Sequence, residues 1–442
     1  MKASVYIETL GCQMNVADTE HAKTRLLEAG FLISDSAQTS DVVIFNTCSV
    51  RERAAQKVFT RIGEVRKTFP DKRPLIGVMG CVAQLEGDTL FDVSGAVDVV
   101  IGTRAVDRIS QTIESALTSQ ARVIDLGERQ AETWKISSEV RHSPYVAFVP
   151  IIEGCNKFCS FCIVPYSRGR ERSRLASDVL DEVRQLRALG FREVHLIGQN
   201  VNSYRPKTDA GLEGIAGATP FSKLLRAVAA TKIERIKFTT SFPRDFHRDI
   251  VDAIEENENL CNWVHLPVQS GNNRVLRAMR RGYNIDDYLR HVDAIKRSKR
   301  NISLTSDIIV GFPGETQEEF EDTIRLVERC QYDSLYIFKY SARPGTPAAN
   351  LNDDISKEEK SSRFQALENL QKGIQKSIFN GYLGRNVRVL VEGISRKSNF
   401  DMTGHSTCHK VVNFYGDNRL AGQEVIVQIT SAKANSLYGT LV

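Results

Sequence analysis

Three apolar segments near the N-terminus share one pattern: each ends in a cysteine, and helical stretches lie between them. The segments VYIETLGC, DVVIFNTC and PLIGVMGC end at Cys12, Cys48 and Cys81. Apolar strands that alternate with helices are typical of a parallel sheet covered on both faces. The carboxyl ends of parallel strands share one edge, where ligands bind, so we expect the three cysteines to converge. Residues 1–118 are therefore predicted to form a Rossmann-like α/β domain. Taken alone, the three cysteines could also be small buried packing residues.

A second set of three cysteines is tightly local. Cys155, Cys159 and Cys162 stand in EGCNKFCSFC with the spacing C-x3-C-x2-C. A loop this short can wrap one metal cluster, but it supplies three thiolates where a [4Fe–4S] cluster usually has four. One iron would stay open for another ligand, as in catalytic metal sites. A zinc site with an outside ligand, or buried free thiols, are the alternatives. The remaining cysteines, Cys261, Cys330 and Cys408, have no such spacing and are predicted to pack in the interior.

The rest of the chain contains a polar stretch and two further regions with different sequence patterns. A polar stretch at 119–142 is predicted to be a linker. Between 143 and 375, six apolar strand candidates alternate with helical patterns, which predicts a (β/α)6 partial barrel. From 376 to 442, short strands separated by turns predict a small all-β barrel.

Composition narrows the class of protein. The chain has 442 residues, 59 Lys and Arg against 54 Asp and Glu, and a net charge of +5, which permits a nucleic-acid partner without demanding one. Nine cysteines in a chain of this size do not fit a secreted disulfide scaffold. No apolar run reaches the roughly 18 residues of a membrane-spanning helix. Glu8 interrupts the apolar N-terminus, which makes it a poor secretory signal. A cytoplasmic location is expected.

With both cysteine sets in view, the chain resembles the radical S-adenosylmethionine (SAM) methylthiotransferases over nearly its whole length. The resemblance rests on TLGCQMN, NTCSVRERA, GVMGCVAQ, EGCNKFCSFCIVPYSRGRERSR, LIGQNVNSY, HLPVQSGN, DIIVGFPGET and YSARPGTPA, and on the C-terminal barrel called TRAM. VEGISRKS and VVNF match the MiaB-type tRNA branch. The segment Gly404–His409 departs from that branch, because a pattern like GRTxxN is expected there.

The resemblance implies an activity and its cofactors. It implies two [4Fe–4S] clusters, a radical-SAM cluster on Cys155, Cys159 and Cys162 and an auxiliary cluster on Cys12, Cys48 and Cys81. The implied reaction adds a methylthio group to C2 of N6-isopentenyladenosine at position 37 of tRNA, through a SAM-derived radical, sulfur insertion and a second SAM as methyl donor. No catalytic residue beyond the cluster ligands is implied.

Further site residues are expected from their positions. Polar residues at strand ends, together with the aromatic residue before the last cluster cysteine, are candidates for binding SAM: Phe161, Gln199, Asn200, Ser241 and Gln269. Strand-end capping is the alternative for the polar ones. Basic residues after the cluster loop and in the TRAM barrel are candidates for contacting RNA: Arg168, Arg170, Arg172, Arg174, Arg396 and Lys397. A solvated loop is the alternative for the four that follow the cluster loop.

The expected partners are a tRNA anticodon stem-loop, a low-potential electron donor such as a flavodoxin-like protein, and a sulfur source. No membrane partner is expected, and the chain is expected to be a monomer. The alternatives in the same family are sister enzymes that act on N6-threonylcarbamoyladenosine or on an aspartate of a ribosomal protein. The alternatives of a different class are a non-catalytic iron–sulfur protein and a zinc-dependent RNA-binding protein.

Overall fold

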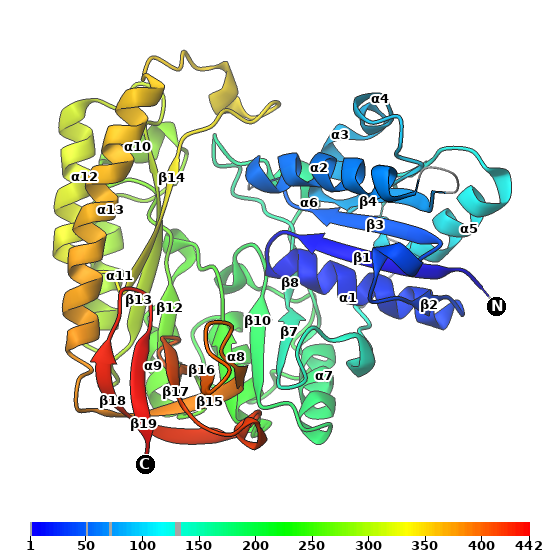
Figure 1. Cartoon of the computed structure of the whole chain (residues 1–442). Coiled ribbons are helices and arrows are strands. Elements are labelled where there is room, and N and C mark those ends of the chain that lie inside the picture. The colour runs from blue at the N-terminus through cyan, green and yellow to red at the C-terminus, as the bar shows by residue number, and fades with distance from the viewer. Residues whose placement is uncertain (1, 50–51, 70–72, 129–133) are drawn as a thin grey trace. The chain divides into compact units, whose positions relative to one another are not determined.

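The computed structural model describes residues 2–49, 52–69, 73–128 and 134–442. It divides into two compact units (Figure 1). The first contains residues 1–143, 147–156 and 163–174, and the second contains 144–146, 157–162 and 175–442. No described helix is long and apolar enough to cross a membrane.

The first unit is built on a six-stranded parallel sheet. Its strand order is β2-β1-β3-β4-β5-β6. The strands are β1 (Ser4–Leu10), β2 (Leu32–Ile33), β3 (Val42–Thr47), β4 (Leu75–Gly80), β5 (Val99–Gly102) and β6 (Val123–Asp125). The helices are α1 (Gln13–Glu28), α2 (Glu52–Thr68), α3 (Cys81–Glu86), α4 (Thr89–Val93), α5 (Ile109–Ser119) and α6 (Val164–Arg168). The predicted Rossmann-like α/β domain is confirmed.

Successive side chains of each strand point to opposite faces of the sheet, and two separate cores result. In β3, Val42 and Ile44 pack in the core that includes α1 and α5. Val43 and Phe45 of the same strand pack in the other core, with residues of α2, α3 and α4. This two-sided burial explains why the strands are apolar without interruption. Part of the predicted linker also belongs here, since β6 is an edge strand of the sheet.

The second unit carries an open row of strands made of two three-stranded sheets. Strand β7 (Val146–Pro150) begins in this unit and neighbours β10 (Glu193–Ile197), which pairs with β11 (Arg235–Phe238). A bridge between Ile236 and Leu260 leads to β12 (Trp263–His265), which is followed by β13 (Ser303–Val310) and β14 (Ser334–Lys339). The helices between and after the strands are α7 (Ala176–Ala188), α8 (Pro220–Ala230), α9 (Asp249–Glu256), α10 (Asn273–Ala278), α11 (Ile285–Lys296), α12 (Gln317–Cys330) and α13 (Lys357–Asn380). The order β7-β10-β11-β12-β13-β14 is the predicted six-strand partial barrel.

A closed five-stranded barrel ends the chain, as predicted. Its order is β15-β16-β17-β19-β18, from β15 (Asn386–Ile394), β16 (Asp401–Ser406), β17 (Val411–Tyr415), β18 (Glu424–Ala432) and β19 (Leu437–Leu441). The sequence pattern does not predict strand β16, because its sequence DMTGHS is mostly small and polar. It nevertheless alternates, with Met402, Gly404 and Ser406 buried. Phe379 and Tyr382, at and just beyond the end of α13, complete the core of the barrel.

Candidate cluster and cofactor sites

The structure brings Cys12, Cys48 and Cys81 together at one edge of the first sheet. Cys12 caps the N-terminus of α1, and Cys81 is the first residue of α3. A hydrogen bond with Cys48 lowers the pKa of the Cys12 thiol to about 5, and a contribution from Arg168 acts in the same direction. A helix N-terminus also favours a thiolate. Burial raises the pKa of Cys81. Thiolates are the form that ligates iron, so this donor set fits an iron–sulfur cluster.

Two asparagines that the sequence analysis did not single out hold this edge in place. Asn15 accepts a hydrogen bond from the backbone of Cys12 (3.2 Å) through its Oδ1. Its Nδ2 donates to Asn46 Oδ1 (3.0 Å), and Asn46 Nδ2 donates in turn to Thr19 Oγ1 (2.9 Å). The signal was present in the sequence, because Asn15 lies three residues after Cys12 and Asn46 two residues before Cys48.

Glycine precedes Cys81 for a steric reason. Gly80 has φ +96°, and a Cβ atom there would lie 2.4 Å from Asn46 Oδ1 and 2.7 Å from the carbonyl oxygen of Thr47. No side chain fits without moving the backbone that leads to Cys48. The turn at Gly80 therefore positions two of the three cysteines.

Arg168 is a buried residue that interacts with Cys12 and Cys81. It is 4% exposed, its Nη2 is 2.5 Å from the Asp18 carboxylate, and it hydrogen-bonds the Cys81 thiol. Arg174 is also buried and donates to the carbonyl oxygen of Pro150 (2.9 Å). Burial gives both side chains a structural role, and their expected contact with RNA stays a prediction that nothing in the structure supports. Arg170 and Arg172 are exposed.

The loop that carries the second cysteine set starts from a tight backbone contact. Gly154, just before Cys155, has φ +79°, and a Cβ there would lie 2.2 Å from the carbonyl oxygen of Arg170. The backbone N–H of Cys155 donates to the carbonyl oxygen of Gly169 (3.1 Å). Cys162 follows Cys159 in a turn, with its N–H donating to the carbonyl oxygen of Cys159 (3.0 Å).

Cys159 has a charged neighbour. Arg281 Nη1 donates to its sulfur over 3.3 Å, and both residues are buried. Ser160 ties the same stretch to the end of α10, because its N–H donates to the carbonyl oxygen of Met279 (3.0 Å). Sequence analysis places Arg281 only in a basic stretch with Arg274, Arg277 and Arg280, since an arginine in MRRGYN carries no signal of burial.

The strand ends that were predicted to bind SAM hold unsatisfied polar atoms. Among the described residues, Gln199 Oε1 and Ser241 Oγ are buried with no hydrogen-bond partner. Gln269 is buried, and its backbone adopts φ +78°, a conformation that residues other than glycine rarely take. Asn200 is buried at the same end of β10. Buried polar groups without partners are costly unless a ligand satisfies them, so these strand ends suit a polar cofactor such as SAM.

Phe161 has a packing role. It packs against a hydrophobic core formed by Val275, Met279, Phe312, Tyr340 and Ala348. Phe312 belongs to the turn that follows β13, so Phe161 connects the cluster loop to that turn. A direct contact with SAM stays a prediction.

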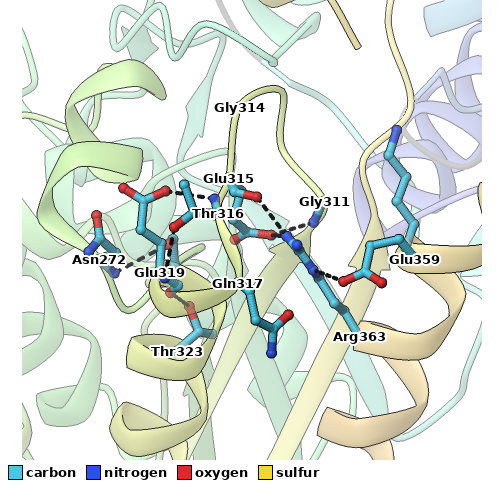
Figure 2. A network of polar contacts seen from close by, with 12 residues as sticks. Asn272, Gly311, Gly314, Glu315, Thr316, Gln317, Glu319, Thr323, Glu359 and Arg363 are labelled. Atoms are coloured by element: carbon cyan, nitrogen blue, oxygen red, sulfur yellow. Dashed lines mark hydrogen bonds and ion pairs between the residues drawn. The ribbon is translucent and has the colours of Figure 1, made fainter. Parts of the chain in front are cut away.

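Figure 2 shows how helix α13 holds this turn, residues 311–315, in place. The Glu315 carboxylate accepts hydrogen bonds from the Gly311 N–H (2.7 Å) and from Arg363 Nη1 (2.9 Å). Arg363 also donates to the carbonyl oxygen of Glu315 (2.9 Å), and both side chains are buried. Burial raises the pKa of Glu315 despite these donors. The turn is thereby fixed before any ligand arrives.

In the C-terminal barrel, the segment 404–409, which departs from the expected pattern, faces the partial barrel. Arg235 donates to the carbonyl oxygens of His405 (2.9 Å) and Ser406 (2.7 Å), and the Asn262 N–H donates to that of Thr407 (2.9 Å). Lys410 Nζ lies 2.5 Å from the Asp333 carboxylate. These residues thus join two parts of the second unit. Arg396 and Lys397 lie instead on an exposed turn, close in sequence to the exposed Phe400.

Glu193, Cys261 and His409 form a buried group at this junction whose ligand atoms lie within 4.8 Å of one another. Arg235 occupies the same space: its Nε is 2.8 Å from Glu193 Oε2, and it hydrogen-bonds Cys261. Burial raises the pKa of Cys261 to about 12. The group is therefore an ion-pair network around a neutral thiol, and Cys261 packs in the interior as predicted.

Comparison with known proteins gives three family matches. Residues 149–327 match the radical SAM superfamily, residues 4–102 match the uncharacterized protein family UPF0004, and residues 381–442 match the TRAM domain. Among solved structures, the radical S-adenosylmethionine methyltransferase TsrM from Kitasatospora setae has a TM-score of 0.56 at 14% identity, covering 79% of this chain and 74% of that one. This likeness supports the fold.

Curated relatives match along the whole chain. The tRNA-2-methylthio-N(6)-dimethylallyladenosine synthase of Erwinia tasmaniensis is 42% identical over 100% of this chain and 93% of its own length. The enzyme of the same name from Solibacter usitatus is 42% identical over 98% of this chain and 97% of its own. The chain therefore belongs to the family of radical SAM tRNA-2-methylthio-N(6)-dimethylallyladenosine synthases.

Proposed function

We propose that this protein adds a methylthio group to C2 of N6-isopentenyladenosine at position 37 of tRNA. The observation that carries the proposal is the pair of cysteine sets in a chain that matches synthases of this reaction along its whole length. When bound, two [4Fe–4S] clusters and SAM would supply the radical chemistry and the sulfur transfer, which side chains alone cannot perform.

The residues of the chain have distinct tasks in this proposal. Cys12, Cys48 and Cys81 hold the auxiliary cluster, and Cys155, Cys159 and Cys162 hold the cluster that binds SAM. Gln199 Oε1 and Ser241 Oγ, which are buried without a hydrogen-bond partner, supply hydrogen-bond acceptors at the strand ends, where SAM is proposed to lie. The turn 311–315 is held rigid by Arg363, which limits the reorganisation needed on binding.

RNA binding is assigned to exposed basic residues. Arg170 and Arg172 follow the cluster loop, and Arg396 and Lys397 lie on the turn between β15 and β16. Phe400 (73% exposed) follows on the same turn and offers a ring on which a base can stack. The proposed partners are a tRNA anticodon stem-loop, a low-potential electron donor and a sulfur source, and the proposed location is the cytoplasm.

SAM cleavage tests the proposal against the alternatives of a different class. The full chain is reconstituted anaerobically with iron and sulfide, reduced, and incubated with SAM and with tRNA carrying isopentenyladenosine. We expect about eight irons per chain, and formation of methionine and 5′-deoxyadenosine that Cys159→Ala abolishes and Cys330→Ala leaves unchanged. An iron-loaded protein that never cleaves SAM would be a carrier or sensor. A protein that stays colourless after reconstitution with iron and sulfide would favour the zinc-dependent RNA-binding protein.

A further inference from the structure

Arg281 is a buried guanidinium next to the cluster loop. It is 5% exposed. Its Nη1 donates to Cys159 Sγ over 3.3 Å, its Nη2 to the carbonyl oxygen of Pro267 over 2.8 Å, and its Nε to the Tyr283 hydroxyl over 3.0 Å. Each nitrogen of the guanidinium has an acceptor, and one acceptor is a cysteine sulfur of the C-x3-C-x2-C loop.

The end of helix α10 directs this side chain inward. The Arg280 N–H donates to the carbonyl oxygen of Arg277 (2.9 Å), and the Arg281 N–H donates to that of Leu276 (3.0 Å). With Arg280 at φ +57°, these two bonds form a Schellman motif. The Arg281 guanidinium then lies 4.5 Å from the ring centre of Phe242. The rotamer is fixed by backbone geometry and by this aromatic contact.

The same helix end also fixes the backbone beside Cys159. The N–H of Ser160 donates to Met279 (3.0 Å) and its hydroxyl to Ala278 (2.8 Å), in both cases to the carbonyl oxygen. The donor and the sulfur are therefore anchored to one element. The contact between the Arg281 guanidinium and Cys159 Sγ is therefore fixed by the backbone on both sides.

Arg281 has no carboxylate partner among the residues that the structure describes. A buried cation without a counter-charge is costly. A [4Fe–4S] core with three thiolates carries a net charge of about −1 when oxidised and about −2 after gaining one electron. Such a group supplies the missing counter-charge, and it supplies more of it in the reduced state.

We propose that Arg281 is a positioning residue that raises the reduction potential of the cluster on Cys155, Cys159 and Cys162 through its hydrogen bond to Cys159 Sγ. This inference rests on the proposed function. Hydrogen bonds to the sulfurs and the net charge around a cluster set its potential. The electron comes from a low-potential one-electron donor, and no proton moves because the guanidinium stays protonated. Arg281 thus makes the first electron transfer easier.

A redox titration tests this inference. The full chain with Cys12, Cys48 and Cys81 changed to alanine keeps one cluster, whose reduced state is counted by electron paramagnetic resonance without SAM. At a fixed potential, Arg281→Gln should lower the ratio of reduced to oxidised cluster at least about tenfold, or about 59 mV for one electron. Arg281→Lys, which keeps the charge but loses the planar fork, should show a smaller fall. The exposed neighbour Arg280→Gln is the matched control and should not change the ratio.

An unchanged midpoint in Arg281→Gln, with four irons bound, overturns the inference and leaves the proposed function intact. If Arg281→Gln does not assemble a cluster, the test uses Arg281→Lys instead. An unchanged midpoint potential of the cluster in Arg281→Lys then overturns the inference. If the parent chain itself binds no cluster on the three cysteines, both the inference and the proposed function fail.

Discussion

At the scale of single residues, the ion pair between Arg168 and Asp18 distinguishes a structural arginine from an RNA contact. Both side chains are buried, at 2% and 0% exposure. Removing one partner of a buried pair leaves an uncompensated charge, which costs about 3–5 kcal/mol. Arg168→Met should therefore lower the thermal midpoint of unfolding and the iron content of the auxiliary site.

Arg170 provides the matched control for this prediction, since it is exposed two residues away. Arg170→Met should leave stability and iron content near those of the parent and weaken tRNA binding, measured by a filter or fluorescence assay at fixed salt. The assignment fails if Arg168→Met binds tRNA less tightly while its stability and iron content are unchanged.

The cysteines were predictable from sequence while the arginines were not, and the reason is physical. Cys12, Cys48 and Cys81 each follow an apolar strand, and parallel topology alone brings strand ends together. Arg168 and Arg281 are charged residues in polar stretches, where burial depends on partners remote in the sequence. Asp18 is 150 residues from Arg168, and Cys159 is 122 from Arg281.

At the scale of elements, helix α13 is fastened to the turn 311–315 by one buried ion pair. Arg363 is 7% exposed and Glu315 is 1% exposed at their side chains. Arg363→Met leaves the buried Glu315 carboxylate without its ion-pair partner, so we expect a loss of about 3–5 kcal/mol in the free energy of unfolding. Weaker SAM binding should accompany the loss, because the turn is no longer fixed. Urea unfolding and isothermal titration measure the two effects.

Arg325 on α12 gives the control, since its ion pair with Asp322 is exposed. Arg325→Met should cost at most about 0.5 kcal/mol. Equal losses in the two variants would contradict the role given to Arg363.

Most elements of the fold could be predicted from periodicity, and the misses share a cause. Strand β16 was missed because a short strand of small and polar residues lacks the apolar signal, although its pairing with β15 and β17 completes the barrel. The edge strand β6 fell within a polar stretch that predicted a linker. The boundaries at 118, 142 and 375 stay a prediction.

At the scale of the whole molecule, the junction of the partial barrel with the TRAM barrel predicts a pH dependence. Burial lowers the pKa of His409 well below its usual value and also lowers that of His195. Both lie close to Glu193 and Lys237, His195 lies close to His405 as well, and both histidines are neutral near pH 7. As pH falls below about 6.5, the unfolded histidines gain protons that the folded ones resist, so stability falls by up to about 1.4 kcal/mol per pH unit for each.

Thermal unfolding between pH 7.5 and 5.5 measures this effect. His409→Gln should flatten the pH dependence, whereas a change at the exposed His247 to glutamine should not. A parent protein whose midpoint does not fall across this range would contradict the buried, neutral state of the two histidines.

The central claim is that this chain methylthiolates isopentenyladenosine in tRNA, and nucleoside mass spectrometry tests it most directly. The chain is expressed in a bacterium that lacks its own adenosine-37 methylthiotransferase, and bulk tRNA is digested. We predict that isopentenyladenosine gains a methylthio group, that Cys159→Ala and Cys48→Ala each abolish the gain, and that Cys330→Ala does not. Unmodified isopentenyladenosine, with both clusters loaded, would contradict the claim, and a gain on threonylcarbamoyladenosine would assign the chain to the sister activity.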